Sequence, residues 1–117
     1  MKRRWRFYET NAGRRPVRNF LDACSDVDAA AIAAGMKDVA IGGLSVSRHL
    51  RGDIYEVRVD GDRQSYRVLF AAEGARGQVL LALEAFSKKS QRTPVSSITV
   101  AEKRLADWHT RGRPHRK

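Results

Sequence analysis

The strongest constraint on the fold is a run of three segments between residues 54 and 87 whose apolar residues recur at every second position. The first segment, 54–60, ends in Asp60-Gly61, which is a hairpin turn signal. The second segment covers 64–72, and a glycine-containing turn separates it from the third, 78–87. Connections this short join antiparallel neighbours, because parallel neighbours need a long crossover. The pattern therefore predicts an antiparallel β-meander.

The N-terminal half adds one short strand and two helices. Residues 4–9 alternate charged and aromatic side chains and predict a strand. Pro16 suits the first turn of a helix over 17–24, whose apolar residues fall at helical spacing. A second helix is predicted to begin with Ser25 or Asp26 as its N-cap and to end at Gly42-Gly43. The short break between the two favours a helical hairpin.

A third helix is predicted after the meander. Thr93 has the residue type of an N-cap, and Pro94 after it suits the first helical position, so the helix should cover 95–110. The order β-α-α-β-β-β-α indicates the α+β class with a mostly antiparallel sheet. We expect one domain over 1–110, followed by a basic, flexible tail over 111–117.

The charge balance points to a polyanionic partner. The chain has 117 residues and carries 23 Lys and Arg against 13 Asp and Glu, which gives a formal net charge of +10. A field of that sign attracts nucleic acid and speeds encounter with it. Cys24 is the single cysteine, and no Cys/His cluster has the spacing of a zinc site, so no metal or cofactor is expected. No secretory signal or membrane-spanning run is apparent, which predicts a cytoplasmic protein without membrane contact.

The period of two also predicts which side chains share a face of the sheet. One face should pack against the helices through Tyr55, Val57, Val59, Tyr66, Val68, Phe70, Val79, Leu81, Leu83 and Ala85. Leu80 and Ala82 should lie on the other side of the sheet, which should form a solvent-facing surface of Glu56, Arg58, Arg67, Glu84, Phe86 and Lys88. Two interpretations fit the second set: a groove for a phosphate backbone and a stacked base, or cross-strand ion pairs on an ordinary solvated face.

Three segments in order resemble a known family. They read LRGDIYEVR over 50–58, YRVLF over 66–70 and AFSKKSQRTP over 85–94, and the following helix carries Ala101 and Arg104 in an A-x-x-R pattern. Together they resemble the HigB-like, phage-derived branch of the RelE/ParE toxin superfamily. The resemblance covers residues 50–104, whereas the N-terminal half agrees only in its predicted helices and strand.

The resemblance implies a RelE-like fold and the function of a toxin in a type II toxin–antitoxin system. The resemblance also implies metal-independent endonucleolytic cleavage of mRNA, usually in the ribosomal A site, which inhibits translation. The implied partners are that mRNA and a cognate antitoxin, expected to be a small helix-turn-helix protein encoded next to the toxin. A heterotetramer with the antitoxin is one assembly that this pairing allows.

Site residues follow from the motif segments and from the chemistry of RNA cleavage. We expect Arg58 and Arg67 to clamp the phosphate, because guanidinium is a bidentate ligand for phosphate. Lys88 and Lys89 are the candidates for proton transfer or charge stabilisation, with Lys88 preferred because it shares the parity of Phe86. Further RNA contacts are expected from Glu56, Phe86, Ser90 and Arg92. Glu56 has the alternative role of ion-pair partner to a neighbouring arginine, and Phe86 that of packing at the sheet edge.

Histidine is the residue best suited to proton transfer near neutral pH, and none of the three histidines lies in the motif segments. His49 precedes the first strand of the meander and remains a candidate. Two other functions stay open at this point. One is a ParE-like gyrase inhibitor, and the other is a non-catalytic module that binds nucleic acid or an antitoxin.

Overall fold

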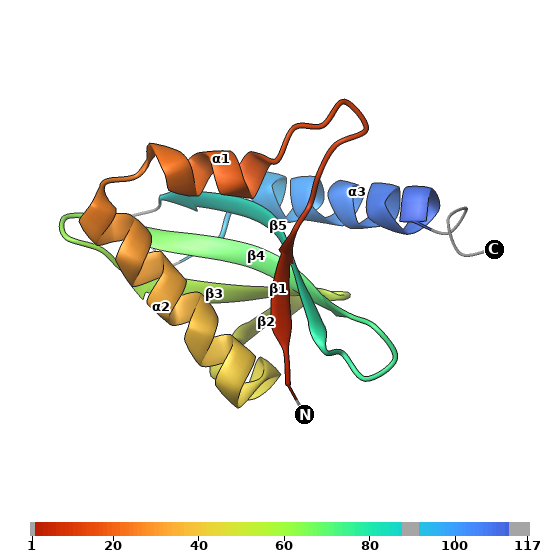
Figure 1. Ribbon diagram of the computed structural model, residues 1–117, viewed down its shortest axis with the longest axis horizontal. Helices are drawn as coiled ribbons and strands as arrows, with labels where there is room; N and C mark the ends of the chain where they lie inside the picture. Colours follow the sequence, from red (N-terminus) through yellow and green to blue (C-terminus); the bar gives the residue numbers. More distant parts are fainter. Residues whose placement is uncertain (1, 88–91, 113–117) are drawn as a thin grey trace.

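The computed structural model describes residues 2–87 and 92–112 and contains one five-stranded sheet with helices on both faces (Figure 1). The strands lie in the order β1-β5-β4-β3-β2. The elements along the chain are β1 (Arg4–Phe7), α1 (Pro16–Ala23), α2 (Asp26–Gly42), η1 (Leu44–Val46), β2 (Arg48–Arg51), β3 (Ile54–Asp60), β4 (Ser65–Glu73), β5 (Val79–Ser87) and α3 (Val95–Gly112).

The predicted meander is confirmed. β3 pairs antiparallel with β4, with Tyr55 opposite Phe70, and β4 pairs antiparallel with β5. β1 adds to the outer side of β5 in parallel, with Arg4 opposite Val79. A parallel neighbour requires a long connection, and the chain between β1 and β5 contains both N-terminal helices and the other strands. The α+β class is therefore confirmed, with one parallel pair at the edge.

The alternation predicted that the second face of the sheet is exposed to solvent. In the structure this face is covered. α1 and α2 cover one face, while α3 lies on the opposite face, where Ile98, Ala101 and Leu105 pack against Ile54 and Leu83 (Figure 1). The period of two reports which residues share a face, but it does not report how many faces are covered. A sheet with helices on both sides buries polar residues that a one-sided sheet would expose.

A β-bulge reverses part of the predicted parity in β5. Leu69 pairs with Glu84 but Phe70 pairs with Ala82, so Leu83 is the extra residue. Leu80 and Ala82 therefore pack in the core under α1 and α2, and Leu81 and Leu83 pack under α3. The predictions for these residues were wrong, and Ala85, beyond the bulge, returns to the predicted face. Both faces are apolar here, so the sequence pattern did not mark the bulge.

Strand β2 was not predicted. Its sequence, Arg-His-Leu-Arg, has no apolar alternation, and β2 lies at the sheet edge with little burial. It pairs antiparallel with β3, placing Arg48 opposite Glu56, and Gly52 makes the connection at a φ of 55°. A positive φ suits glycine, which lacks a Cβ. This hairpin brings β2 to the region where α3 begins.

The predicted helices are present, with differences at their ends. Ser25 caps α2 as expected, since its Oγ accepts a hydrogen bond from the Asp28 N–H at 3.2 Å. Thr93 is not the N-cap of α3: the Pro94 carbonyl accepts the first helical hydrogen bonds, and the Thr93 hydroxyl bonds elsewhere. α3 continues to Gly112, two residues into the expected tail, and residues 113–117 lie outside the described chain. Within the described residues, no helix is both long and apolar enough to cross a bilayer.

Candidate functional site

A cleft of about 350 Å³ lies where β2, β3 and the start of α3 meet. The residues that line it carry mostly cationic or polar side chains, and they are Arg48, His49, Leu50, Arg58, Arg92, Thr93 and Ile98. β2 supplies the first three, and the segment leading into α3 supplies Arg92 and Thr93. The β2–β3 hairpin and the return of the chain into α3 therefore build this cleft together.

The cleft concentrates positive charge. Arg48, Arg58 and Arg92 all line it, and the side chain of Arg58 is 30% exposed. Burial lowers the pKa of the nearby Arg67, and so does the positive charge of Arg58 and Arg48, against the opposing effect of Glu56. Clustered guanidinium groups on a partly enclosed surface attract an anion more strongly than the same groups spread over an open surface. The cleft is therefore suited to bind a phosphate group.

A buried carboxylate organises the floor of the cleft. Glu56 is 1% exposed, and its Oε1 accepts a hydrogen bond from Arg58 Nε at 2.8 Å. Its Oε2 accepts a hydrogen bond from the Thr93 hydroxyl, which itself accepts one from Arg67 Nη1 at 2.9 Å. Arg67 Nη1 lies 3.9 Å from Glu56 Oε2. One carboxylate thus balances two arginines, and the group as a whole remains cationic.

This network has a consequence for Arg58. Because Glu56 binds Nε, the side chain is held in one orientation while the guanidinium remains beside the cleft. A charge-assisted hydrogen bond of this kind is stronger than a neutral one. The carboxylate therefore acts as an anchor that fixes an arginine at the edge of the cleft.

His49 adds an imidazole ring to the lining of the same cleft. Its Nε2 lies 2.8 Å from the Gly52 carbonyl oxygen, and its ring lies 4.9 Å from the ring of Tyr55. A carbonyl can only accept, so this hydrogen bond requires a proton on Nε2. In the neutral ring the lone pair is then on Nδ1. The turn after β2 thereby selects the tautomer that leaves Nδ1 able to accept a proton.

The sequence predicted that Glu56, Arg58 and Arg67 share one exposed face of the sheet. They do share a face, but that face is not exposed. Glu56, Arg58 and Arg67 lie on the side of the sheet that α3 covers, and Arg67 is only 3% exposed. Glu84 is bound by Arg104 at 3.1 Å, and Phe86 packs against the core under α3. The prediction that the face is open to solvent was wrong for Glu56, Arg67 and Phe86, because α3 crosses it. Arg58 remains 30% exposed and lines the cleft. The alternative role given to Glu56, that of ion-pair partner to a neighbouring arginine, is confirmed.

The remaining predicted residues divide into two groups. Arg92 is exposed and lines the cleft. Lys88, Lys89 and Ser90 lie outside the described residues. The sequence did not single out Arg48 or Thr93 as site residues. Arg48 joins the cleft through the unpredicted β2, and Thr93 joins it through a hydroxyl that had been assigned to helix capping.

Metal ligands do not gather in the part of the chain that the structure describes. No group of three or more His, Cys, Asp or Glu side chains is close enough there to hold an ion. The side chains that line the described cleft include three guanidinium groups, one imidazole and one hydroxyl. These are groups that bind and polarise a phosphodiester.

The fold and the cleft define a class: a small α+β protein with helices on both sides of its sheet and an arginine-lined cleft at one edge. The family model described as "Phage derived protein Gp49-like (DUF891)" matches residues 19–106, and the chain belongs to this family. The chain is also 34% identical over 107 residues to proteins named "Probable endoribonuclease HigB1" in Mycobacterium tuberculosis strains CDC 1551 / Oshkosh and ATCC 25618 / H37Rv. Each match covers 89% of this chain and 83% of the relative. The resemblance drawn from residues 50–104 is confirmed.

Proposed function

We propose that this protein is an endoribonuclease, the toxin of a type II toxin–antitoxin pair, and that it inhibits translation by cutting mRNA in the ribosomal A site. The relatives in Mycobacterium tuberculosis carry the name of an endoribonuclease, and this chain aligns with most of their length. The observation that carries the proposal is the cleft that Arg48, Arg58 and Arg92 line together with His49. This arrangement is suited to a single RNA strand, whose phosphate it binds and whose 2′-OH it can activate.

Cleavage in this cleft would be a transesterification within the RNA. The 2′-OH attacks the adjacent phosphorus, the bond to the 5′-oxygen breaks, and the products are a 2′,3′-cyclic phosphate and a 5′-OH. The arginines would stabilise the negative charge that accumulates on the phosphorus substituents in the transition state. His49 Nδ1 would accept the proton of the 2′-OH, because Nε2 is already committed to the Gly52 carbonyl.

Lys88 and Lys89 keep their proposed role, which is to protonate the leaving 5′-oxygen or to stabilise its charge. Ser90 keeps its proposed contact with the RNA, whereas Phe86 has its alternative role, that of packing, because it lies against the core under α3. Each lysine ammonium has protons to donate, whereas an arginine stays protonated and acts through its charge. The ribosome would align the mRNA, and no metal is required for this chemistry.

Arg67 and Glu56 would act as positioning residues. Arg67 is buried beneath the cleft and binds Thr93, and Glu56 binds Arg58. Removing Arg67 would leave the buried Glu56 carboxylate with less compensation, and breaking such a buried pair costs about 3–5 kcal/mol. We therefore expect Arg67→Ala to relieve growth arrest through loss of the folded state.

The cognate antitoxin is proposed to be an acidic or wrapping partner encoded beside this gene, with a helix-turn-helix domain. It would neutralise the toxin by covering the cationic cleft, since complementary charge speeds and directs association. A heterotetramer of two toxins and two antitoxins is the proposed assembly, and the cytoplasm is the proposed location.

The test is primer extension on cellular mRNA after induction of the wild type and of Arg58→Ala/Arg92→Ala. The wild type should produce discrete cuts, in frame with translation, and the double variant should lose them. Lys37→Ala/Arg63→Ala is the matched control, because it removes the same charge from exposed positions on α2 and the β3–β4 turn. Circular dichroism must show that both variants fold.

Two results would reject the proposal. Cuts of wild-type strength in the folded double variant would place the active site elsewhere. Absence of cuts together with a DNA-damage response would favour the ParE-like gyrase inhibitor.

A further inference from the structure

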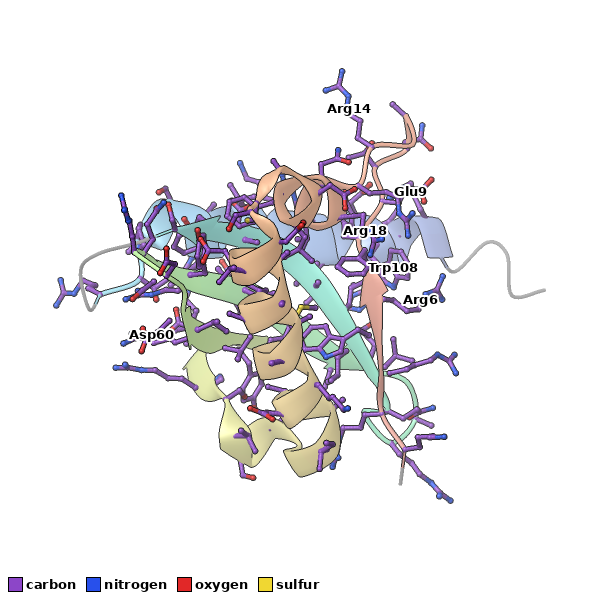
Figure 2. All side chains as sticks on the ribbon, turned by 60° about the vertical axis from the view of Figure 1, so that its left-hand side comes forward. Arg6, Glu9, Arg14, Arg18, Asp60 and Trp108 are labelled. Carbon is purple, nitrogen blue, oxygen red and sulfur yellow. The ribbon has the colours of Figure 1, made fainter. Side chains whose placement is uncertain are left out.

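A second cationic surface lies at the opposite edge of the sheet from the cleft. It consists of Lys2, Arg4, Arg6 and Arg76 together with Trp108, and we call it the β1-edge surface. β1 is the edge strand, and its burial pattern exposes Arg4 and Arg6 while turning Trp5 and Phe7 inward. Figure 2 shows Arg6 and Trp108 close together beside β1.

The four cations are not neutralised by neighbouring carboxylates. Across residues 2–87 and 92–112, no ion pair involves Lys2, Arg4, Arg6 or Arg76. Two acidic side chains on neighbouring elements have other partners: Glu73 Oε1 lies 2.7 Å from His109 Nε2, and Asp107 binds Arg111 at 2.8 Å. The surface therefore keeps its full positive charge.

The geometry of the surface suits a regular phosphate backbone. Arg4 and Arg6 are two positions apart on one strand, so their Cα atoms are about 6.6 Å apart, which is of the order of the spacing between successive phosphates. Arg6 lies over the Trp108 ring, with 5.1 Å between its guanidinium carbon and the ring centroid. A cation–π contact restrains the side chain without cancelling its charge. Lys2 and Arg76 line a hollow of about 430 Å³ at the beginning of the same strand.

The surface lacks the apolar centre that a protein partner would use. Protein interfaces have an apolar core with a polar rim. The large apolar side chains with the greatest exposure are Val27, Ile41, Val46 and Val95, which lie on α2, in η1 and at the start of α3. None of them is on β1, although the Ile41 carbonyl accepts a hydrogen bond at 3.4 Å from Arg3, which directly precedes β1. Charge without an apolar core favours a nucleic-acid backbone over a folded protein.

The position of α3 links this surface to the cleft. α3 begins at the cleft, where Ile98 lines the wall, and it ends beside β1, where Trp108 contacts Arg6. Four strand spacings separate β1 from β2, which puts the two edges about 19 Å apart. A molecule can therefore hold one RNA element at each edge at the same time.

We propose that the β1-edge surface binds the phosphate backbone of a double-helical RNA while the cleft holds the single strand that is cut. The inference rests on the proposed function, because it names the structured RNA that would anchor the enzyme beside its substrate. Recognition would be by backbone shape and charge, as is usual for double-stranded RNA, and not by base sequence.

The test compares RNA binding by the full chain and by Arg4→Glu/Arg6→Glu, using fluorescence anisotropy with an RNA duplex and with a short single-stranded RNA. The variant should bind the duplex at least tenfold more weakly and keep its affinity for the single strand. Two fewer phosphate contacts should also reduce the salt dependence of duplex binding, by a slope of about two. Arg4→Gln/Arg6→Gln should show the same direction with a smaller effect.

The matched control is Lys37→Glu/Arg63→Glu, which makes the same change in net charge on exposed residues elsewhere. If it weakens duplex binding as much as the edge variant does, the effect is one of net charge and the proposal is wrong. A polyglutamate peptide serves as a second anionic probe. If the edge variant loses as much affinity for this peptide as for the duplex, RNA is rejected as the specific ligand. Duplex binding that depends on Arg4 and Arg6, in a protein that makes no cuts, would support this surface while rejecting the proposed nuclease.

Discussion

At the scale of the residue, the most consequential feature is a carboxylate buried between two arginines. Glu56 looks like a solvent-facing residue in an alternating strand, yet it is 1% exposed and binds both Arg58 and Thr93. Buried charge is tolerated only when it is paired and hydrogen-bonded. The network is therefore a condition for the fold as well as a support for the cleft.

Substitution of Thr93 tests how much the hydrogen bonds of this network contribute to the stability of the fold. Thr93→Val keeps the shape of the side chain but removes the hydroxyl that donates to Glu56 Oε2 and accepts from Arg67 Nη1. We expect the free energy of unfolding to fall by about 1–3 kcal/mol. Urea denaturation measures it, and Thr93→Ser, which retains the hydroxyl, should lose much less. Equal stability of wild type and Thr93→Val would contradict the role of the hydroxyl.

Tyr66 gives a pH-dependent prediction on the other face of the sheet. Its hydroxyl donates to Asp28 Oδ2 at 2.5 Å, and this bond, together with burial, raises the pKa of Tyr66 to about 12. A raised pKa means that stability is complete below the unfolded value near 10 and is lost as pH rises through 12. The stability difference between wild type and Tyr66→Phe should therefore shrink from pH 10 to pH 12. Urea titrations at several pH values measure it, and a constant difference would refute the prediction.

At the scale of the element, α2 shows why helix propensity is a weak guide inside a packed protein. Gly35 lies in the middle of α2, where glycine is normally unfavourable by about 1 kcal/mol relative to alanine. A Cβ at this position would lie 2.5 Å from Val59 Cγ2. The glycine lets the helix approach β3 closely, which explains a residue that the sequence alone marks as a weak point.

Gly35→Ala should accordingly destabilise the protein despite the better helix propensity of alanine. Overpacking of this kind costs about 1–3 kcal/mol. Thermal unfolding gives the comparison, and the added substitution Val59→Ala should recover part of the loss by making room for the methyl group. If Gly35→Ala alone is more stable than the wild type, α2 can shift without cost and the prediction is wrong.

The elements differ in how much of them can be predicted from sequence. β3 was predicted with its observed bounds, because alternation and a turn signal coincide there. β2 was missed, since an edge strand needs no apolar alternation and depends on pairing with β3. α3 was predicted as a helix, but its docking on the second face of the sheet was not, because an amphipathic stripe does not identify what it packs against.

At the scale of the whole molecule, the net charge of +10 divides into separate sites. Arg48, Arg58 and Arg92 gather at the β2 edge, while the β1-edge surface lies across the sheet. The exposed cations on α2 and in the β3–β4 turn belong to neither. Composition predicts a polyanionic partner, whereas the distribution of charge predicts where that partner binds.

Binding of a single-stranded RNA should therefore depend steeply on salt, with a slope near 0.7 for each phosphate contacted. Arg92→Ala should reduce that slope by about 0.7 because it removes one contact in the cleft. Lys37→Ala should leave the slope unchanged, since Lys37 lies on α2. Anisotropy titrations over a range of salt concentrations provide the measurement. Equal slopes for all three proteins would mean that the cleft does not bind the strand.

The sequence by itself determined the order of most elements, the antiparallel meander and the family, because turn signals, periodicity and short motifs are local. It also proposed Arg58 and Arg92 as site residues, and both line the cleft. Only the tertiary structure decided that Glu56 and Arg67 are buried, that Arg48 and His49 join the cleft, and that β5 bulges at Leu83. These facts depend on which elements pack together, and above all on α3 crossing a face of the sheet that the alternation left open to solvent.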